Sequence, residues 1–332
     1  MNKRYASQAD GSYVLDVPYS DEREQLGDLL RFGKDAEVMA PPDLGGRINW
    51  VLHEAVGGMF DTFLPRTYEV IVLAEMDVDQ RSKLGFSSGG VLSSRSVMLP
   101  ELSNLMAIAP AGADTTAMQR LVVDEDALHK PSAANRAKTF SFLRNLYGLN
   151  PQLPIYREFT RLCHLSPVDM PVLAGTLAFA REPILRACAD MVLDTAIGKP
   201  LGREDFEAWV REYAPGRYSQ TMYVSFSHNL YASFFQLGYL SEAAGKTRIR
   251  KRRDVPPVSV AYAAFLDWLT GLNGLSLLTG AFSKTLELPK GDHLNLLSAA
   301  GQQGLMRVAH AGGVLQLDFF TWLRPGETRL LL

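Results

Sequence analysis

The sequence contains little cysteine, because its 332 residues include only Cys163 and Cys188. Neither cysteine lies in a spacing typical of metal ligands or of a redox pair, and the histidines show no metal-ligand spacing. Free thiols are typical of a reducing compartment, so the sequence favours a cytoplasmic protein. We expect no metal site and no cofactor.

Long hydrophobic runs are also missing. The most apolar window, residues 258–282, contains Asp267 and is broken by Gly271, Gly274 and Gly280. A membrane-spanning helix needs about 20 mostly apolar residues without such interruptions. The N-terminus is polar and carries no signal peptide. The sequence therefore predicts a protein that does not enter a membrane.

Catalytic motifs are scarce. Residues 85–89, GFSSG, match the G-x-S-x-G pattern of a nucleophile elbow, but the charged segment 77–83 precedes them instead of a strand. Cys163 and His164 are adjacent and have no ordering partner nearby in the sequence. The sequence predicts a protein that is not an enzyme.

The composition is that of a globular protein, with 47% hydrophobic and 21% charged residues. The 34 basic and 36 acidic residues argue against a surface that binds nucleic acid everywhere, but they leave room for a local basic face. Helical signals dominate beyond residue 85. We expect a mainly α protein, a helical bundle with helix–turn–helix or winged-helix-like modules, preceded by a small α+β N-terminal module.

Residues 128–150 have the pattern of the second helix of a helix–turn–helix. Ser132 is a good N-cap, Gly148 is a natural stop, and every charged side chain between them is basic. A helix with such residues at its start can contact phosphates and base edges. The alternative is an ordinary core helix with solvated basic residues. The candidate DNA contacts are Lys130, Ser132, Asn135, Arg136, Lys138 and Arg144.

A second basic segment, residues 246–253, has six cations in eight residues. Charged and uncharged residues alternate over residues 246–250, which predicts a strand, and Gly245 before them predicts the turn of a hairpin. A wing placed after a helix would lie along the phosphate backbone. The alternative is a solvated loop, or a segment that pairs with acids elsewhere. The candidate contacts are Lys246, Arg248, Arg250, Lys251, Arg252 and Arg253.

Between these segments and beyond them the sequence predicts further helices. An aromatic series at helical spacing in residues 218–239 indicates a core face rather than a base-stacking surface. Residues 293–309 are expected to form a helix, and residues 314–322 a terminal strand.

The N-terminal 60 residues resemble the C-terminal extension of WYL-domain transcriptional regulators. The blocks YVLDVPYSDERE, LLRFG and EVMAPP carry the resemblance in order, whereas the WYL domain itself and its upstream winged helix are absent. The expected elements are strands at 13–17 and 37–40 and helices at 21–32 and 44–56. The resemblance implies a docking or dimer-contact role, and residues 61–83 are expected to be a connector.

The remainder resembles the BrxA family of BREX (bacteriophage exclusion) systems, over about residues 83–330. The blocks LGFSSGGVLSSRSVMLPELSNLM, VVDEDALHKPSAANRAKTFSFLRNLYGL and FAREPILRACADMVLDTAIGKPLGREDFEAWV follow one another, and SHNLYASFFQLGYLSE comes later. The resemblance implies an N-terminal helical domain at 84–216 with helix–turn–helix character, and a winged-helix-like domain at 217–332.

Together the two resemblances and the basic segments predict a DNA-binding accessory component of a phage defence system. Its partners would be double-stranded DNA, bound mainly through phosphates, and other BREX proteins. Residues 1–60 would supply a homodimer contact. The alternatives are a protein–protein adaptor within the defence complex and a transcriptional repressor.

Overall fold

The computed structural model describes residues 4–7, 13–16, 78–87, 89–110, 112–243, 247–311 and 313–328. The chain divides into two compact units, residues 1–64 and residues 65–332. Lys246 lies outside the described residues, as do the elements expected between residues 17 and 77.

The first unit contains an antiparallel hairpin. Its strands are β1 (Arg4–Ser7) and β2 (Tyr13–Asp16), with Tyr5 opposite Leu15. The strand expected at residues 13–17 is therefore confirmed.

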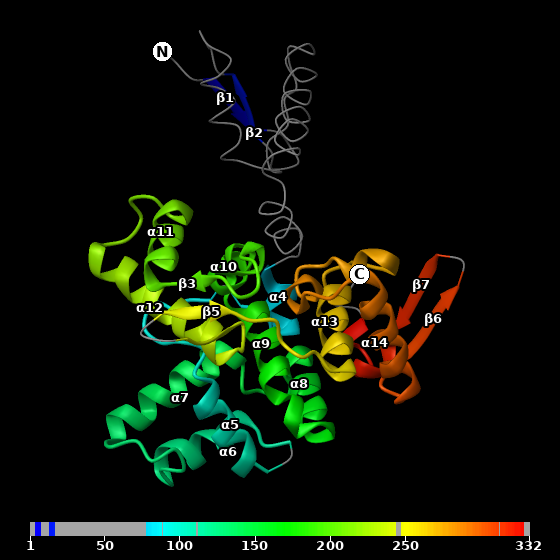
Figure 1. Cartoon of the computed structure of the whole chain (residues 1–332), viewed down its shortest axis with the longest axis horizontal. Coiled ribbons are helices and arrows are strands. Elements are labelled where there is room, and N and C mark those ends of the chain that lie inside the picture. The colour runs from blue at the N-terminus through cyan, green and yellow to red at the C-terminus, as the bar shows by residue number, and fades with distance from the viewer. Residues whose placement is uncertain are drawn as a thin grey trace. The chain divides into compact units, whose positions relative to one another are not determined.

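The second unit is mainly helical, which confirms the expected fold class. Its helices in the described residues are α4 (Val78–Leu84), α5 (Leu99–Ile108), α6 (Thr115–Gln119), α7 (Ala133–Tyr147), α8 (Pro154–Leu165), α9 (Met170–Arg181), α10 (Pro183–Asp194), α11 (Arg203–Tyr213), α12 (Gln220–Gln236), α13 (Pro257–Leu269) and α14 (Lys290–Gln302). Almost every residue of α9 is buried, and α5, α7, α8, α10 and α13 pack around it (Figure 1). The core of the unit is therefore organised around α9.

Capping side chains set several helix ends, among them the predicted start of α7 at Ser132. The Ser132 hydroxyl accepts a hydrogen bond from the Asn135 amide at the start of α7, and Asp114 accepts one from the Ala117 amide at the start of α6. Gly148 ends α7 with a φ of 91°, a left-handed conformation that favours glycine. A π-helical turn, η2 (Arg120–Asp124), extends α6 toward α7.

Residues 183–250 form one module with a small sheet at its edge. Its elements follow in the order α10, β3 (Pro200–Leu201), α11, α12, β4 (Leu240–Glu242) and β5 (Arg248–Arg250). The antiparallel sheet has the strand order β3-β5-β4. A helix–turn–helix followed by a hairpin, with one short strand between the first two helices, is the order of a winged helix. We call residues 183–250 the first module.

The boundary that the resemblance places at residues 216–217 falls between α11 and α12. These helices pack against each other, and the rings of Phe206 and Tyr231 lie 5.6 Å apart between their centroids. The first module therefore extends across this boundary.

After α13 the chain forms two 3-10 turns, η4 (Gly274–Leu278) and η5 (Ser283–Leu286), before α14. The helix expected to reach residue 309 is wrong, because α14 ends at Gln302. Beyond Gly304, which has a φ of 74°, the chain forms the hairpin of β6 (Arg307–Ala311) and β7 (Val314–Asp318). A left-handed glycine stops the helix and lets the chain reverse.

His293 makes stability depend on pH. It belongs to α14, its side chain is buried, and its Nε2 has no hydrogen-bond partner among the described residues. Burial disfavours the charged ring and lowers the pKa of His293 to about 4. The unfolded chain therefore takes up a proton on this ring near the ordinary histidine pKa, whereas the ring in the folded chain stays neutral until the pH nears about 4. The contribution of His293 to stability is full above the ordinary pKa and is lost as the pH falls toward the folded pKa.

We therefore expect acidification from pH 7 to pH 4 to remove roughly 3 kcal/mol through this group alone. Urea unfolding at both pH values measures the loss, and His293→Leu should show a correspondingly smaller loss. Equal pH dependence of the two proteins would contradict the assignment.

Candidate nucleic-acid interface

Two of the basic residues predicted around α7 hold the turn before it. The Lys130 ammonium pairs with Glu101 at 3.1 Å. Arg136 donates through Nε to the Val123 carbonyl at 2.8 Å, and its Nη1 lies 3.6 Å from an oxygen of Asp126. These side chains fasten α7 to α5 and η2, so their charges are largely used within the protein.

The other residues predicted on α7 are placed differently. Ser132 is occupied as the N-cap, whereas Asn135, Lys138 and Arg144 are exposed. Lys138 and Arg144 are separated by six positions, which places them about 120° apart around the helix. The structure thus confirms a helix after a turn, but it leaves α7 with separated cations rather than one basic face.

Arg250 is a correction to the sequence analysis, because it cannot contact DNA. Its side chain is 1% exposed and lies on the inner face of β5. Its Nε donates to the Val192 carbonyl at 2.8 Å, and its guanidinium pairs with Glu287 and stacks near Tyr239. The arginine for which the sequence predicts a phosphate contact on the wing therefore points into the core.

Arg253 is the second correction. It is buried, with its guanidinium 3.9 Å from the centre of the Tyr239 ring, and donates through Nη2 to the Thr285 carbonyl at 3.1 Å. Burial lowers the pKa of this guanidinium from its ordinary value. The prediction that it contacts phosphate is wrong, because no phosphate can reach a side chain enclosed in this way.

The rest of the basic run lies at the surface. Lys251 and Arg252 are exposed, and Arg248 lies partly exposed over Tyr231 and Phe235, with 3.7 Å to the Phe235 ring centre. Partial burial lowers the pKa of Arg248, and the nearby positive charge of Arg203 acts in the same direction. The two guanidiniums therefore lie close enough to repel each other.

Sheet pairing brings two further cations to this edge that sequence reading missed. The Lys199 carbonyl accepts a hydrogen bond from the Arg250 amide at 2.8 Å, so β3 lies beside β5. No local signal marks this pairing, because β3 and β5 are far apart in the sequence. We define the wing patch as Lys199, Arg203, Arg248, Lys251 and Arg252.

Acidic side chains moderate the wing patch. Glu242 lies opposite Arg248 in the antiparallel register, and Asp254 is exposed just after the basic run. The net positive charge of the wing patch is therefore small, and we expect charge alone to give only modest affinity for DNA.

One face of α12 is open while the other is core. Tyr223, Phe226, Leu230 and Phe234 are buried, which confirms the core interpretation for most of the aromatic series. The outward positions recur at intervals of four, three and four residues, a spacing that keeps them on one side of a helix. We call these residues the α12 ridge: Thr221, Ser225, His228 and Ala232.

The segment before α5 holds one flank of α12. The side-chain amide of Asn229 donates to the Leu92 carbonyl at 2.9 Å. The backbone amides of Val97 and Leu99 donate to the Ser233 hydroxyl and to the Gln236 side-chain carbonyl, each at 3.0 Å. These bonds fix the rotation of α12. The α12 ridge consequently lies between this segment and the aromatic residues that carry Arg248.

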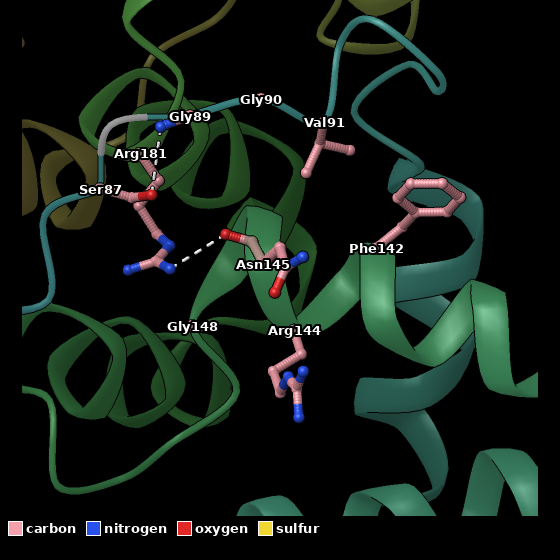
Figure 2. Close-up of a pocket in the computed structure, with 9 residues that line it drawn as sticks. All are labelled: Ser87, Gly89, Gly90, Val91, Phe142, Arg144, Asn145, Gly148 and Arg181. Carbon is pink, nitrogen blue, oxygen red and sulfur yellow. Dashed lines mark hydrogen bonds between the residues drawn. The ribbon is translucent and has the colours of Figure 1, made fainter.

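A pocket of about 430 Å³ lies between the glycine-containing turn and the end of α7. Figure 2 shows Arg181 bonded to the Asn145 carbonyl, and its other nitrogens donate to Gly85 and Leu146. Burial lowers the pKa of Arg181 to about 10, which leaves it charged at neutral pH. Its donors are directed to backbone carbonyls, so they brace the pocket rather than offering a ligand site.

The GFSSG segment forms part of that pocket's wall. The Ser87 hydroxyl accepts a hydrogen bond from the Gly89 amide at 3.2 Å, and the buried Glu182 carboxylate accepts from Gly90 and Val91. Desolvation raises the pKa of Glu182. No histidine, cysteine or carboxylate is among the described residues that line the pocket. The turn is thereby held by an internal carboxylate.

No group of histidine, cysteine, aspartate and glutamate among the described residues is arranged to hold a metal ion. None of the helices in that part of the chain is long and apolar enough to cross a membrane.

Comparison with protein families matches residues 3–56 to the WCX domain. WCX domains occur in the C-terminal extensions of WYL-domain regulators, which agrees with the resemblance of the N-terminal 60 residues. No curated protein sequence matches the chain. The resemblance of the remaining chain to the BrxA family stays a prediction.

Proposed function

We propose that this protein binds double-stranded DNA through the first module and has no catalytic centre. The supporting observation is the winged-helix order of α10 to β5, with the exposed and half-buried residues of the α12 ridge beside the wing patch. In helix–turn–helix proteins the second helix of the motif enters the major groove, and a wing lies along the backbone. Here α12 enters the major groove, and the wing patch contacts the phosphates.

The electrostatics of the wing patch favour a phosphate between its arginines. The guanidiniums of Arg203 and Arg248 both lie near the Tyr231 ring, at 6.0 Å and 4.4 Å from its centre, and they repel each other. A phosphate oxygen between two guanidiniums relieves that repulsion and forms charge-assisted hydrogen bonds. Because the α12 ridge has no lysine or arginine, sequence preference would come from its hydroxyl and imidazole groups.

The wider role that we propose is that of an accessory component of a BREX-type phage defence system. It would act with other BREX proteins in the cytoplasm, as the resemblance implies. The N-terminal module would then supply a docking or homodimer contact.

The test is a titration of duplex DNA at several salt concentrations. The slope of log K against log salt is negative, and replacing Lys251 and Arg252 by glutamate is expected to make it shallower by about 2, because each lost phosphate contact contributes about 0.9 to its magnitude. A matched pair of reversals on α7, Lys138→Glu with Arg144→Glu, should leave the slope unchanged. The proposal fails if the wild-type protein does not bind duplex DNA at low salt, or if only the α7 pair alters the slope.

A second candidate function is transcriptional repression, and the WCX match favours it. A repressor would protect one promoter, whereas a defence component that reads DNA mainly through phosphates would protect many sites. Footprinting across genomic fragments distinguishes the two roles.

A further inference from the structure

The chain after the first module repeats its order of elements. The sequence α13, η4, η5, α14, β6, β7 follows the order of α10, β3, α11, α12, β4, β5. The 3-10 turn η4 stands in the place of the short strand β3, and β7 packs against η4 as β5 pairs with β3. We call residues 257–318 the second module.

The exposed side of α14 corresponds to that of α12. His293, Leu297 and Ala300 face the core, and α14 packs on α13 through them. The outward positions recur at intervals of four, three and four residues, as on α12. These residues, the α14 ridge, are Gly291, Asn295, Ser298 and Gln302.

The hairpin after α14 stands where the wing of the first module stands. Arg307 and His310 on β6 are exposed, and Gln316 is exposed on β7. Lys290 at the start of α14 is exposed as well, with Asp292 as the acidic residue beside it. Amide groups on the helix, with Arg307 on the hairpin and Asp318 opposite it in the register, are an arrangement that fits a groove flanked by phosphates.

We propose that the second module is a further duplex-DNA-binding module, with α14 in the groove and the β6–β7 hairpin along the backbone. This inference rests on the proposed function of the first module and extends it to a two-part site.

Contacts between the modules fix the separation of the two parts. Arg250 of β5 pairs with Glu287, and the Tyr239 hydroxyl donates to the Thr285 carbonyl at 2.8 Å. Lys284 and Asp190 form a further ion pair at 2.8 Å. In Figure 1 the modules lie on either side of α9. A rigid pair of modules selects DNA that meets both of them at one spacing, and each contact raises the effective concentration of the other.

The test compares three double variants of the full chain by footprinting and titration on long duplex DNA. The first, Asn295→Glu with Ser298→Glu, places carboxylates on the α14 ridge. The second, Thr221→Glu with His228→Glu, does so on the α12 ridge. The control, Leu165→Glu with Val168→Glu, adds the same charge at positions that are 60% and 83% exposed, outside both modules. Circular dichroism verifies that each variant folds.

The wild-type protein is expected to protect two tracts of DNA. The α14 variant should protect one tract and bind at least about 10-fold more weakly, because the second contact no longer adds to the first. If the wild-type protein binds but the α14 variant behaves like the control, the second module does not bind DNA and the first module still does. If the wild-type protein does not bind, the proposed function itself fails.

Discussion

Replacing Arg250 with alanine is expected to lower the free energy of unfolding by about 3–5 kcal/mol, the cost of breaking a buried ion pair from one side. The change leaves the Glu287 carboxylate without its guanidinium partner, and it also removes the donor to the Val192 carbonyl. Glu287 has a φ of 55°, which is strained for a residue other than glycine, so packing around the pair must hold it in place. Urea unfolding followed by circular dichroism measures the loss.

Arg252→Ala is the matched control for that measurement. Arg252 is exposed two positions further along the same run, so its loss should change stability by less than about 0.5 kcal/mol. It should instead weaken DNA binding. Equal stabilities of the two variants would contradict the assignment of Arg250 to the core.

Placing carboxylates at Thr221 and His228 is expected to raise the Kd for duplex DNA by about 100-fold. Like charges at an interface cost several kcal/mol, and each 1.4 kcal/mol is about a tenfold change. Both positions are exposed on the ridge that faces away from the core of α12, so the protein should remain folded. Fluorescence anisotropy on a labelled duplex measures the change at fixed salt.

The comparison for this variant is an equivalent change on α7, Asn135→Glu with Lys138→Glu. These residues are also exposed, and the substitutions change the net charge by −3, one unit more than the −2 of the α12 variant, so they form the more severe electrostatic control. We expect the Kd to rise by less than about threefold, from the general field alone. Loss of binding in the α7 variant, with retention in the α12 variant, would move the groove contact to α7.

Local rules explain which parts of the fold the sequence predicted well. Ser132 and Gly148 can be recognised from their own chemistry, and the structure confirms both as the ends of α7. Caps, glycine stops and helical periodicity act within a few residues, so no knowledge of the tertiary fold is needed.

The wing patch could be predicted only in part, because its geometry depends on distant pairing. A run of cations indicates a basic segment, but only the tertiary contacts with Glu287 and Val192 show that Arg250 is buried while Arg252 stays exposed. Lys199 joins the patch through pairing of β3 with β5 across about fifty residues of chain. The sequence places the aromatic series of residues 218–239 in the core, which the structure confirms for most of it, yet the opposite face of α12, the α12 ridge, carries the candidate groove contact.

Site-specific photo-cross-linking tests the central claim most directly. A photoreactive amino acid replaces His228 on the α12 ridge in one protein and Asn135 on α7 in another, and each is irradiated with duplex DNA at low salt. The account predicts a cross-link to bases from position 228 and none from position 135. Cross-linking from position 135 alone would contradict the account and make α7 the helix that enters the groove.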